Sequence, residues 1–249
     1  MTDQNPFYEN LLEYYDEIFP VTQERIDFIV SHLPDRPYPQ RILDVGCATG
    51  GTAIALARRG LEVTGIDNEW TMIQSANRKN PEPKSNARFL CMDMREVDSW
   101  FPPRSFDTLL CLGNTLVHLD SLGTIETFLG SMGRLCQPPA TVILQFVNYK
   151  EILKSQNPHL PPIKTSRCRF ERQYQRLPNG KLLFEGRLYS STEEMVFEGT
   201  NELYPLLLDD CITLLEKHSF TNIKVYEDFT GAPYRDDGLG VLVVAHLMK

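Results

Sequence analysis

The chain has 249 residues, and 42% of them are hydrophobic, which is enough for one large α/β domain with an insertion but hardly for two full domains. Its 33 acidic residues outnumber its 25 basic ones, and the net charge of -8 argues against nucleic acid or another polyanion as the main partner. The N-terminus is polar and acidic, and no apolar run approaches the ~18 residues of a membrane span. We therefore expect a cytoplasmic protein that has no membrane partner.

The cysteines and histidines give no sign of a metal site. None of the six cysteines forms a C-x-x-C pair, and the five histidines are isolated from one another. Metal sites of the zinc type need closely spaced thiolate and imidazole ligands. We expect no bound metal, and we expect free thiols in a reducing compartment.

Short apolar strands alternate with helical segments through the first part of the chain. The runs that predict strands lie at 41–46, 62–67, 87–92, 106–113 and 140–148. The patterns that predict helices lie at 51–60, 68–79 and about 121–136, and two earlier ones, at 8–19 and 22–33, form an N-terminal cover over residues 1–36. Strands that are apolar throughout and separated by helices are buried on both faces. The fold class predicted is therefore α/β, with a doubly wound, mostly parallel, Rossmann-like sheet.

The pattern changes after residue 149. Alternating polar and apolar positions, with an Asn-Gly turn in LPNGK, predict an antiparallel β insertion of about three strands within residues 160–200. We expect this insertion to act as a lid over the carboxyl edge of the sheet.

The α/β pattern resumes after the insertion with a helix at 205–220 and strands at 223–228 and 240–248. The loop between the two strands has no helical pattern, so we expect them to pair antiparallel. The whole chain, residues 1–249, is then one domain with a seven-stranded sheet and an antiparallel C-terminal strand.

The stretch ILDVGCATGG follows the first strand, where an open parallel sheet binds its ligand. Gly46, Ala48 and Gly51 fit the pattern G-x-G/A-x-x-G, and Asp67 follows at a distance suited to a carboxylate on ribose hydroxyls. These features alone are compatible with a dinucleotide. Asp44 argues against one, because a carboxylate there repels a pyrophosphate but suits a ligand with an ammonium and a sulfonium.

A third carboxylate, Asp93, comes at the end of the third strand. It can accept a hydrogen bond from an adenine amino group, with Met94 and Leu112 as apolar neighbours of the ring. Asp44 and Asp93 could each cap a helix instead. Carboxylates at three successive strand ends, however, resemble the class I S-adenosylmethionine-dependent methyltransferases.

This resemblance covers the chain apart from the insertion and implies S-adenosylmethionine as cofactor, with S-adenosylhomocysteine as product. It implies that the loop from Gly46 to Gly50 approaches the methionine part, that Asp67 holds the ribose and that Asp93 holds the adenine. The cofactor-binding residues expected on this basis are Tyr15, Asp44, Gly46, Cys47, Ala48, Gly50, Asp67, Asn68, Asp93, Met94, Leu112 and Gly113.

Tyr15 is included because an aromatic ring can cover a sulfonium through cation–π attraction, although Tyr14 and Tyr15 are equally compatible with core packing. The sequence departs from the family in two places. Ala48 replaces the usual middle glycine of the loop, and LCQPPAT stands where a Gly-Gly turn normally precedes the fifth strand.

Two further segments, LLCLGNTLVHL and NYKEIL, resemble segments of glycine N-methyltransferase and its small-molecule relatives. On this basis Asn114, His118 and Tyr149 are candidates for a catalytic role, and Asn114 and Asn148 are candidates for binding the substrate. An asparagine side chain offers both a donor and an acceptor to a small polar substrate. His118 can be a base, or it can simply hydrogen-bond the backbone or pack beside the cofactor.

A substrate carboxylate would need a cationic partner, and the insertion offers Arg167, Arg169 and Arg172. Arg169 is taken as the substrate-binding candidate, although the sequence does not choose among the three.

Three functions are compatible with the sequence. The first is methylation of a small molecule, with a small amine or amino acid as the preferred acceptor. The second is methylation of oxygen, sulfur or a protein side chain by the same fold. The third, from another class, is a nicotinamide-dependent oxidoreductase or a non-catalytic nucleotide-binding module, against which Asp44, Asp93 and the antiparallel terminal pair argue.

Overall fold

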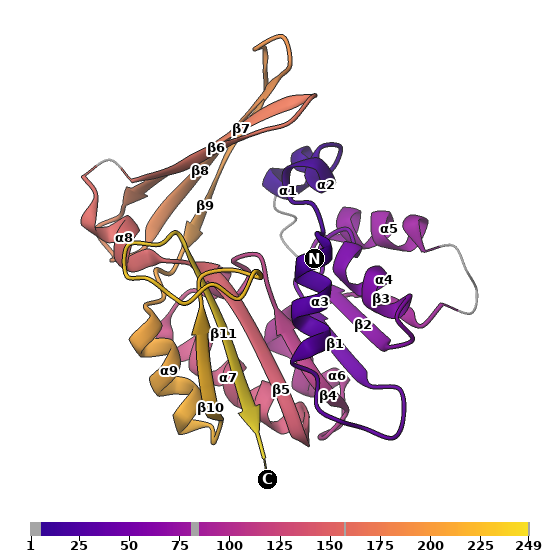
Figure 1. The fold of residues 1–249 in the computed structure, drawn as a ribbon. Coiled ribbons are helices and arrows are strands. Elements are labelled where there is room, and N and C mark those ends of the chain that lie inside the picture. Colours follow the sequence, from indigo (N-terminus) through magenta and orange to yellow (C-terminus); the bar gives the residue numbers. More distant parts are fainter. Residues whose placement is uncertain (1–5, 81–84, 157, 249) are drawn as a thin grey trace.

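A seven-stranded sheet forms the body of the molecule in the computed structural model, which describes residues 6–80, 85–156 and 158–248 (Figure 1). Its strand order is β10-β11-β5-β4-β1-β2-β3, and every strand runs parallel except β11, which is antiparallel to β5 and β10. The strands are β1 (Arg41–Val45), β2 (Glu62–Asp67), β3 (Ala87–Cys91), β4 (Phe106–Cys111), β5 (Cys136–Val147), β10 (Thr221–Tyr226) and β11 (Gly240–Leu247). The predicted doubly wound sheet and its antiparallel C-terminal strand are confirmed.

Strand β5 begins earlier than expected, at Cys136 rather than at residue 140. The stretch LCQPPAT therefore runs into the strand instead of forming a turn before it. Pro138 and Pro139 hid this extension, because proline cannot donate to a ladder and normally argues against a central strand. The regular pairing with β11 starts only after them, at Ala140.

Helices cover both faces of the sheet, because its strands carry apolar side chains on both sides. Along β1, Leu43 and Val45 belong to one buried core and Ile42 to another, as the alternation of a strand requires. The first core includes α6 (Val97–Trp100), α7 (Leu122–Leu135) and α9 (Leu208–Lys217), and the second includes α3 (Gln23–Ser31), α4 (Gly51–Ala57) and α5 (Trp70–Lys79). Among the described residues, none of the helices combines the length and the apolar character that a membrane span requires.

The insertion is a separate antiparallel sheet that rises above the carboxyl ends of the parallel strands (Figure 1). Its four strands are β6 (His159–Lys164), β7 (Cys168–Arg176), β8 (Leu182–Ser190) and β9 (Met195–Leu203), in that order. About three strands were expected, and β6 was missed because its sequence HLPPIK contains two prolines. Strand β6 pairs only with β7, and a sheet edge tolerates proline.

The N-terminal segment packs mainly on this four-stranded sheet of β6, β7, β8 and β9, which we call the lid. In place of one helix at 8–19, the described part of this segment contains the short helices α1 (Pro6–Leu11) and α2 (Tyr15–Ile18); residues 1–5 of the expected cover lie outside the described residues. Phe7, Leu11 and Ile18 share a buried cluster with Phe170 and other side chains of the lid. Only α3 packs against the large sheet as expected.

Candidate functional site

The lid, the N-terminal helices and the carboxyl ends of the parallel strands line a cavity of about 640 Å³. All the predicted cofactor-binding residues except Gly50 line this cavity, and so do Asn114 and His118. Tyr149, Asn148 and Arg169 do not line it. The structure therefore brings most of the predicted site together at the edge of the sheet where an α/β fold binds its ligand.

The loop after β1 is shaped by backbone in the left-handed region. Gly46 and Gly50 have φ values of 71° and 77°, and Ala48 has 48°. A Cβ atom on Gly46 would clash with the side chain of Thr115, so glycine is required there for space as well as for conformation. Gly50 faces inward, where a Cβ would meet Phe89 at 2.7 Å, which explains why it packs beneath the cavity and does not line it.

Asp67, at the end of β2, holds this loop in place. Its Oδ2 accepts a hydrogen bond of 2.8 Å from the Ala48 N–H, and its Oδ1 accepts one of 3.0 Å from the Glu69 N–H. Burial raises the pKa of Asp67, while these backbone hydrogen bonds act in the opposite direction. An ionised carboxylate has about four acceptor positions, so capacity remains for the hydroxyls of a ribose.

Asp44 and Arg25 are an incompletely satisfied pair of opposite charges in the same cavity. Asp44 is 3% exposed and its Oδ2 has no hydrogen-bond partner among the described residues; the same is true of the buried Nε of Arg25, from α3. Burial raises the pKa of Asp44 to about 7, and burial lowers the pKa of Arg25 although the nearby Asp44 opposes that effect. A ligand with both an ammonium and a carboxylate would satisfy both side chains, as the methionine end of S-adenosylmethionine would. Sequence reasoning missed Arg25, which looked like any polar residue of a cover helix.

Asp93 lies in the cavity lining, but part of its carboxylate is already engaged. It caps the short helix η1 (Met94–Glu96) by accepting 2.8 Å from the Arg95 N–H, and the Arg95 guanidinium also donates to both of its oxygens. Burial raises the pKa of Asp93, but the hydrogen bonds from Arg95 outweigh that effect and the net pKa is lowered. The capping role and the expected adenine contact are therefore both compatible with this position.

Hydrogen bonds join the turn after β4 to the end of β5. Gly113 and Asn114 both have positive φ, 65° and 72°. Gln145 accepts from both of them, through its side-chain Oε1 from the Gly113 N–H at 3.1 Å and through its main-chain oxygen from the Asn114 N–H at 3.1 Å. The Asn114 side chain in turn accepts from the Val147 N–H at 3.0 Å and donates to the Tyr149 hydroxyl at 3.0 Å. Left-handed asparagine is uncommon, and these bonds hold it at the cavity.

Tyr149 contacts the site through Asn114 and not directly. It is 1% exposed at the start of α8 (Tyr149–Lys154), and its hydroxyl hydrogen-bonds the Asn114 side chain. Its predicted catalytic place is therefore corrected to one behind the cavity wall, because the helix that begins at Tyr149 turns the ring into the core.

His118, in the short helix η2 (Leu116–His118), faces a residue that sequence reasoning missed. Its Nε2 and the Tyr8 hydroxyl share a hydrogen bond of 2.8 Å, and the two rings lie 5.7 Å apart in an edge-on arrangement. Burial lowers the pKa of His118 to about 4, so the imidazole is neutral near neutral pH, and burial raises the pKa of Tyr8. The aromatic residues Tyr8 and Tyr15 both line the cavity, whereas Tyr14 stacks outside it beneath Arg167.

Two predicted substrate-binding residues point elsewhere. The Asn148 amide donates to the main-chain oxygens of Asp236 and Gly238, so it fixes the loop before β11. Arg169 lies on the outer face of the lid, where it pairs with Glu171 and Glu193. Successive side chains of a strand point to opposite faces.

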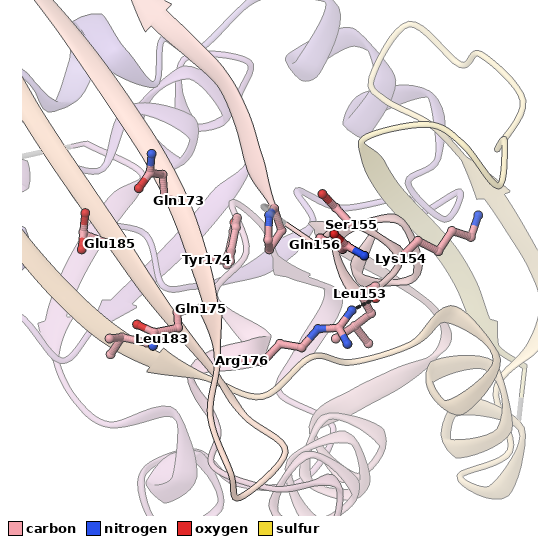
Figure 2. Close-up of a pocket in the computed structure, with 11 residues that line it drawn as sticks. Leu153, Lys154, Ser155, Gln156, Gln173, Tyr174, Gln175, Arg176, Leu183 and Glu185 are labelled. Carbon is pink, nitrogen blue, oxygen red and sulfur yellow. Dashed lines mark hydrogen bonds between the residues drawn. The ribbon is translucent and has the colours of Figure 1, made fainter.

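A second hollow, of about 700 Å³, lies between the end of α8 and the lid strands β7 and β8 (Figure 2). Its lining is mostly polar and includes Gln173, Arg176 and Glu185, and Arg176 donates to the main-chain oxygen of Leu153. Tyr174 lines both spaces. The predicted cofactor residues lie only around the inner cavity.

Comparisons with known proteins agree with this geometry. Residues 42–139 match the family described as methyltransferase domain. The chain is similar to a glycine/sarcosine N-methyltransferase from Aphanothece halophytica, with 25% identity over 239 residues that cover 94% of this chain and 87% of the relative.

Solved structures share the fold. The CcbJ methyltransferase from Streptomyces caelestis has a TM-score of 0.82 at 16% identity, with 99% of this chain and 100% of that chain covered. CalS10 from Micromonospora echinaspora, an amino pentose methyltransferase with S-adenosylmethionine bound, has a TM-score of 0.67 at 18% identity, with 94% of this chain and 95% of that chain covered.

The fold and the cavity are those of an enzyme that transfers a methyl group from S-adenosylmethionine. The methyltransferase-domain match of residues 42–139 and the similarity to these relatives support a class I S-adenosylmethionine-dependent methyltransferase. The alternative of a nicotinamide-dependent oxidoreductase or a non-catalytic nucleotide-binding module is thereby set aside. Within the described residues, no group of three or more His, Cys, Asp or Glu side chains is arranged to hold a metal ion.

Proposed function

We propose that the methyl acceptor is the nitrogen of a small amine or amino acid. The observation that carries this proposal is the turn at Gly113 and Asn114, which lines the cavity and is held in place by hydrogen bonds of the Asn114 side chain with Val147 and Tyr149. The similarity to a glycine/sarcosine N-methyltransferase over most of both chains supports it. Because the cofactor and the acceptor share about 640 Å³, the acceptor is a small molecule.

S-adenosylmethionine, when bound, supplies an electrophilic methyl group on a sulfonium. The chain's own part is to bind and orient the reactants and to exclude water. Asp44 and Arg25 would hold the methionine end, Asp67 with Asn68 would hold the ribose, and Asp93 with Met94 and Leu112 would hold the adenine. Tyr15 covers the site from α2, which Asp16 ties to the loop after β1 by accepting 2.6 Å from the Thr49 hydroxyl.

The Gly113–Asn114 turn shapes the acceptor side of the cavity, and Tyr149 is a positioning residue that fixes Asn114. His118 is too weak a base to deprotonate an ammonium, because its pKa lies at about 4. Its role is to hold Tyr8, and with it α1, against the cavity. The amine must then arrive as the free base, so the rate rises between about pH 7 and 9 as an ammonium of pKa near 8 to 10 loses its proton.

A labelling experiment tests the proposal. The purified enzyme is incubated with a metabolite extract and a cofactor that carries a deuterated methyl group, and mass spectrometry identifies the labelled products. A labelled amine supports the proposal. Label found only on oxygen, sulfur or a protein side chain would refute it and leave the methyltransferase assignment intact.

A further inference from the structure

Arg172, on β7 of the lid, differs from the other arginines of that sheet. Arg167 pairs with Glu13 and Glu17, Arg169 with Glu171 and Glu193, and Arg187 with Glu185 and Glu198. Arg176 donates to the main-chain oxygen of Leu153. Among the described residues, no acidic side chain forms an ion pair with Arg172, and its only hydrogen bond given by the geometry runs from Nη2 to the Pro161 oxygen at 2.8 Å.

The position of Arg172 makes this lack of an anion costly. The side chain is partly buried, it lines the inner cavity, and its Nε is buried without a partner. Burial lowers the pKa of its guanidinium, and the only opposing effect comes from the neighbouring Tyr174. A cation that is taken out of water and left unpaired destabilises the protein unless a ligand supplies the anion.

The sheet side of the cavity is mainly acidic, although Arg25 lies there beside Asp44. Asp44, Asp67 and Asp93 all lie at the ends of the parallel strands, whereas Arg172 projects from the lid. A small molecule with an amine at one end and a carboxylate at the other is therefore oriented by the cavity itself. Its carboxylate is drawn toward Arg172 on the lid, and its neutral amine then lies toward the sheet, where Asn114 lies.

The lid wall around Arg172 is otherwise apolar. Leu160 lies directly across from Arg172 on β6, and Phe184 and Leu203 contribute from β8 and β9. On β8 the position opposite Arg172 is Gly186, and the rings of Phe7 and Phe170 occupy the space over this glycine, so the wall is apolar on that side too. An apolar wall of this kind favours a ligand with a hydrocarbon side chain over glycine, which has no side chain to pack against it.

We propose that Arg172 binds a carboxylate of the methyl acceptor and that the acceptor carries an apolar side chain, which packs against Leu160, Phe184 and Leu203. The class of substrate is then an α-amino acid with an aliphatic or aromatic side chain. This inference rests on the proposed function only in that the acceptor occupies this cavity. The fork of a guanidinium binds a carboxylate through two parallel hydrogen bonds.

The test measures equilibrium binding to the protein loaded with S-adenosylhomocysteine, so that it does not depend on turnover. The probes are leucine, its deaminated analogue isocaproate, its decarboxylated analogue isoamylamine, and glycine. Isocaproate and leucine are expected to bind, and leucine is expected to bind at least tenfold more tightly than glycine because its side chain contacts the apolar wall. Failure of the wild-type protein to bind either carboxylate overturns the proposal, and equal binding of glycine and leucine overturns its apolar part.

Variants assign the carboxylate to Arg172. Arg172→Met is expected to lower the affinities for leucine and isocaproate by about tenfold to a hundredfold and to change the affinity for isoamylamine by no more than about threefold. The affinities of Arg172→Lys for leucine and isocaproate are expected to lie between those of the wild type and those of Arg172→Met, since lysine keeps the charge but lacks the two parallel donors of the guanidinium. Arg187→Met is the matched control, because Arg187 lies on the outer face of the same sheet, and it leaves all four affinities unchanged. Equal loss for isoamylamine and isocaproate would show that the lid was disturbed and not the carboxylate contact, and would overturn the assignment.

Two further outcomes separate the competing explanations. A loss of S-adenosylhomocysteine affinity in Arg172→Met, with no effect on isocaproate, would mean that Arg172 holds the carboxylate of the cofactor, which overturns the inference. If no amine is methylated in the labelling experiment, the proposed function fails, but the isocaproate comparison still decides whether Arg172 binds an acceptor carboxylate.

Discussion

The buried Asp44 carboxylate is expected to lower the stability of the ligand-free protein. Its folded-state pKa of about 7 lies above the ordinary value of 3.8, so between these values the folded protein holds a proton that the unfolded chain releases. The stabilisation from this proton is complete below about pH 4 and is lost as the pH rises toward and through 7. The difference of about three pH units corresponds to about 4 kcal/mol, which is the most that Asp44→Asn can recover at pH 8.

Urea denaturation of the wild-type protein and of Asp44→Asn, without cofactor, measures this effect. The difference in free energy of unfolding between the two proteins isolates Asp44, because all other titrating groups, His118 among them, are common to both. That difference should shift in favour of the variant by about 3 kcal/mol between pH 5 and pH 8. A difference that stays constant over this range would show that Asp44 is ionised in the fold with an ordinary pKa, and the reasoning would be wrong.

The same substitution should weaken the cofactor at pH 8. The ionised Asp44 attracts the ammonium and the sulfonium, and the amide of asparagine does not, so we expect at least about a tenfold loss of affinity for S-adenosylmethionine. Stability and binding then change in opposite directions, which distinguishes a functional carboxylate from a helix cap. A cap would lose stability on substitution at every pH.

Four other substitutions or deletions test the remaining parts of the site. Asp67→Ala should cost roughly 2 to 4 kcal/mol of cofactor affinity in a titration, and less than a threefold loss would mean that the ribose lies elsewhere. Asp93→Asn should weaken cofactor binding less than Asp93→Ala, because the amide oxygen still accepts; equal losses would point to the cap of η1 alone. Asn114→Ala should lower kcat/KM by roughly tenfold to a hundredfold while the cofactor affinity hardly changes, and a parallel loss of affinity would contradict a role confined to the acceptor. Replacing residues 164–199 by a short Gly-Ser bridge should abolish turnover and also weaken cofactor binding, because α1 and α2 pack on the insertion and Tyr174 and Leu182 belong to the main core; turnover that persists would contradict a role of the insertion in the site.

The sequence predicts the large sheet well because its signals are local. Runs such as RILDV and FDTLLC are apolar on both faces, and glycine or proline marks their ends, so strand positions and the doubly wound arrangement follow from composition and spacing. The errors fall where proline hides a strand. Both the start of β5 and the whole of β6 contain a Pro-Pro pair, and a propensity argument rejects them although a sheet edge or an irregular pairing accepts them.

Most residues of the cofactor side of the site are also local in sequence, since they lie at or just after the ends of β1, β2, β3 and β4; Tyr15 and Arg25, from α2 and α3, are the exceptions. The acceptor side is not. Alternate side chains of β7 point to opposite faces of the lid, and the strand register decides which of them face the cavity. A register shift of one residue would exchange the two sets, and the parallel sheet that forms the other side of the cavity lies far away in sequence. Arg169 and Arg172 are therefore indistinguishable until the register with β8 is known.

The N-terminal helices give the clearest case of information that no local pattern carries. Gly186 on β8 and Gly199 on β9 are register partners, and a Cβ on either would lie within 3 Å of the Phe7 ring or of Phe170 or Phe197. The two glycines leave a depression in the lid sheet, and Phe7 fills it. This contact sets α1 in place and brings the next residue, Tyr8, to His118. Read alone, glycine in a strand only weakens it, and phenylalanine near a terminus is only an apolar residue. The role of these residues is clear only in the folded protein, where chain segments almost 180 residues apart come into contact. The two glycines determine the position of Phe7, and Phe7 forms part of the cavity wall.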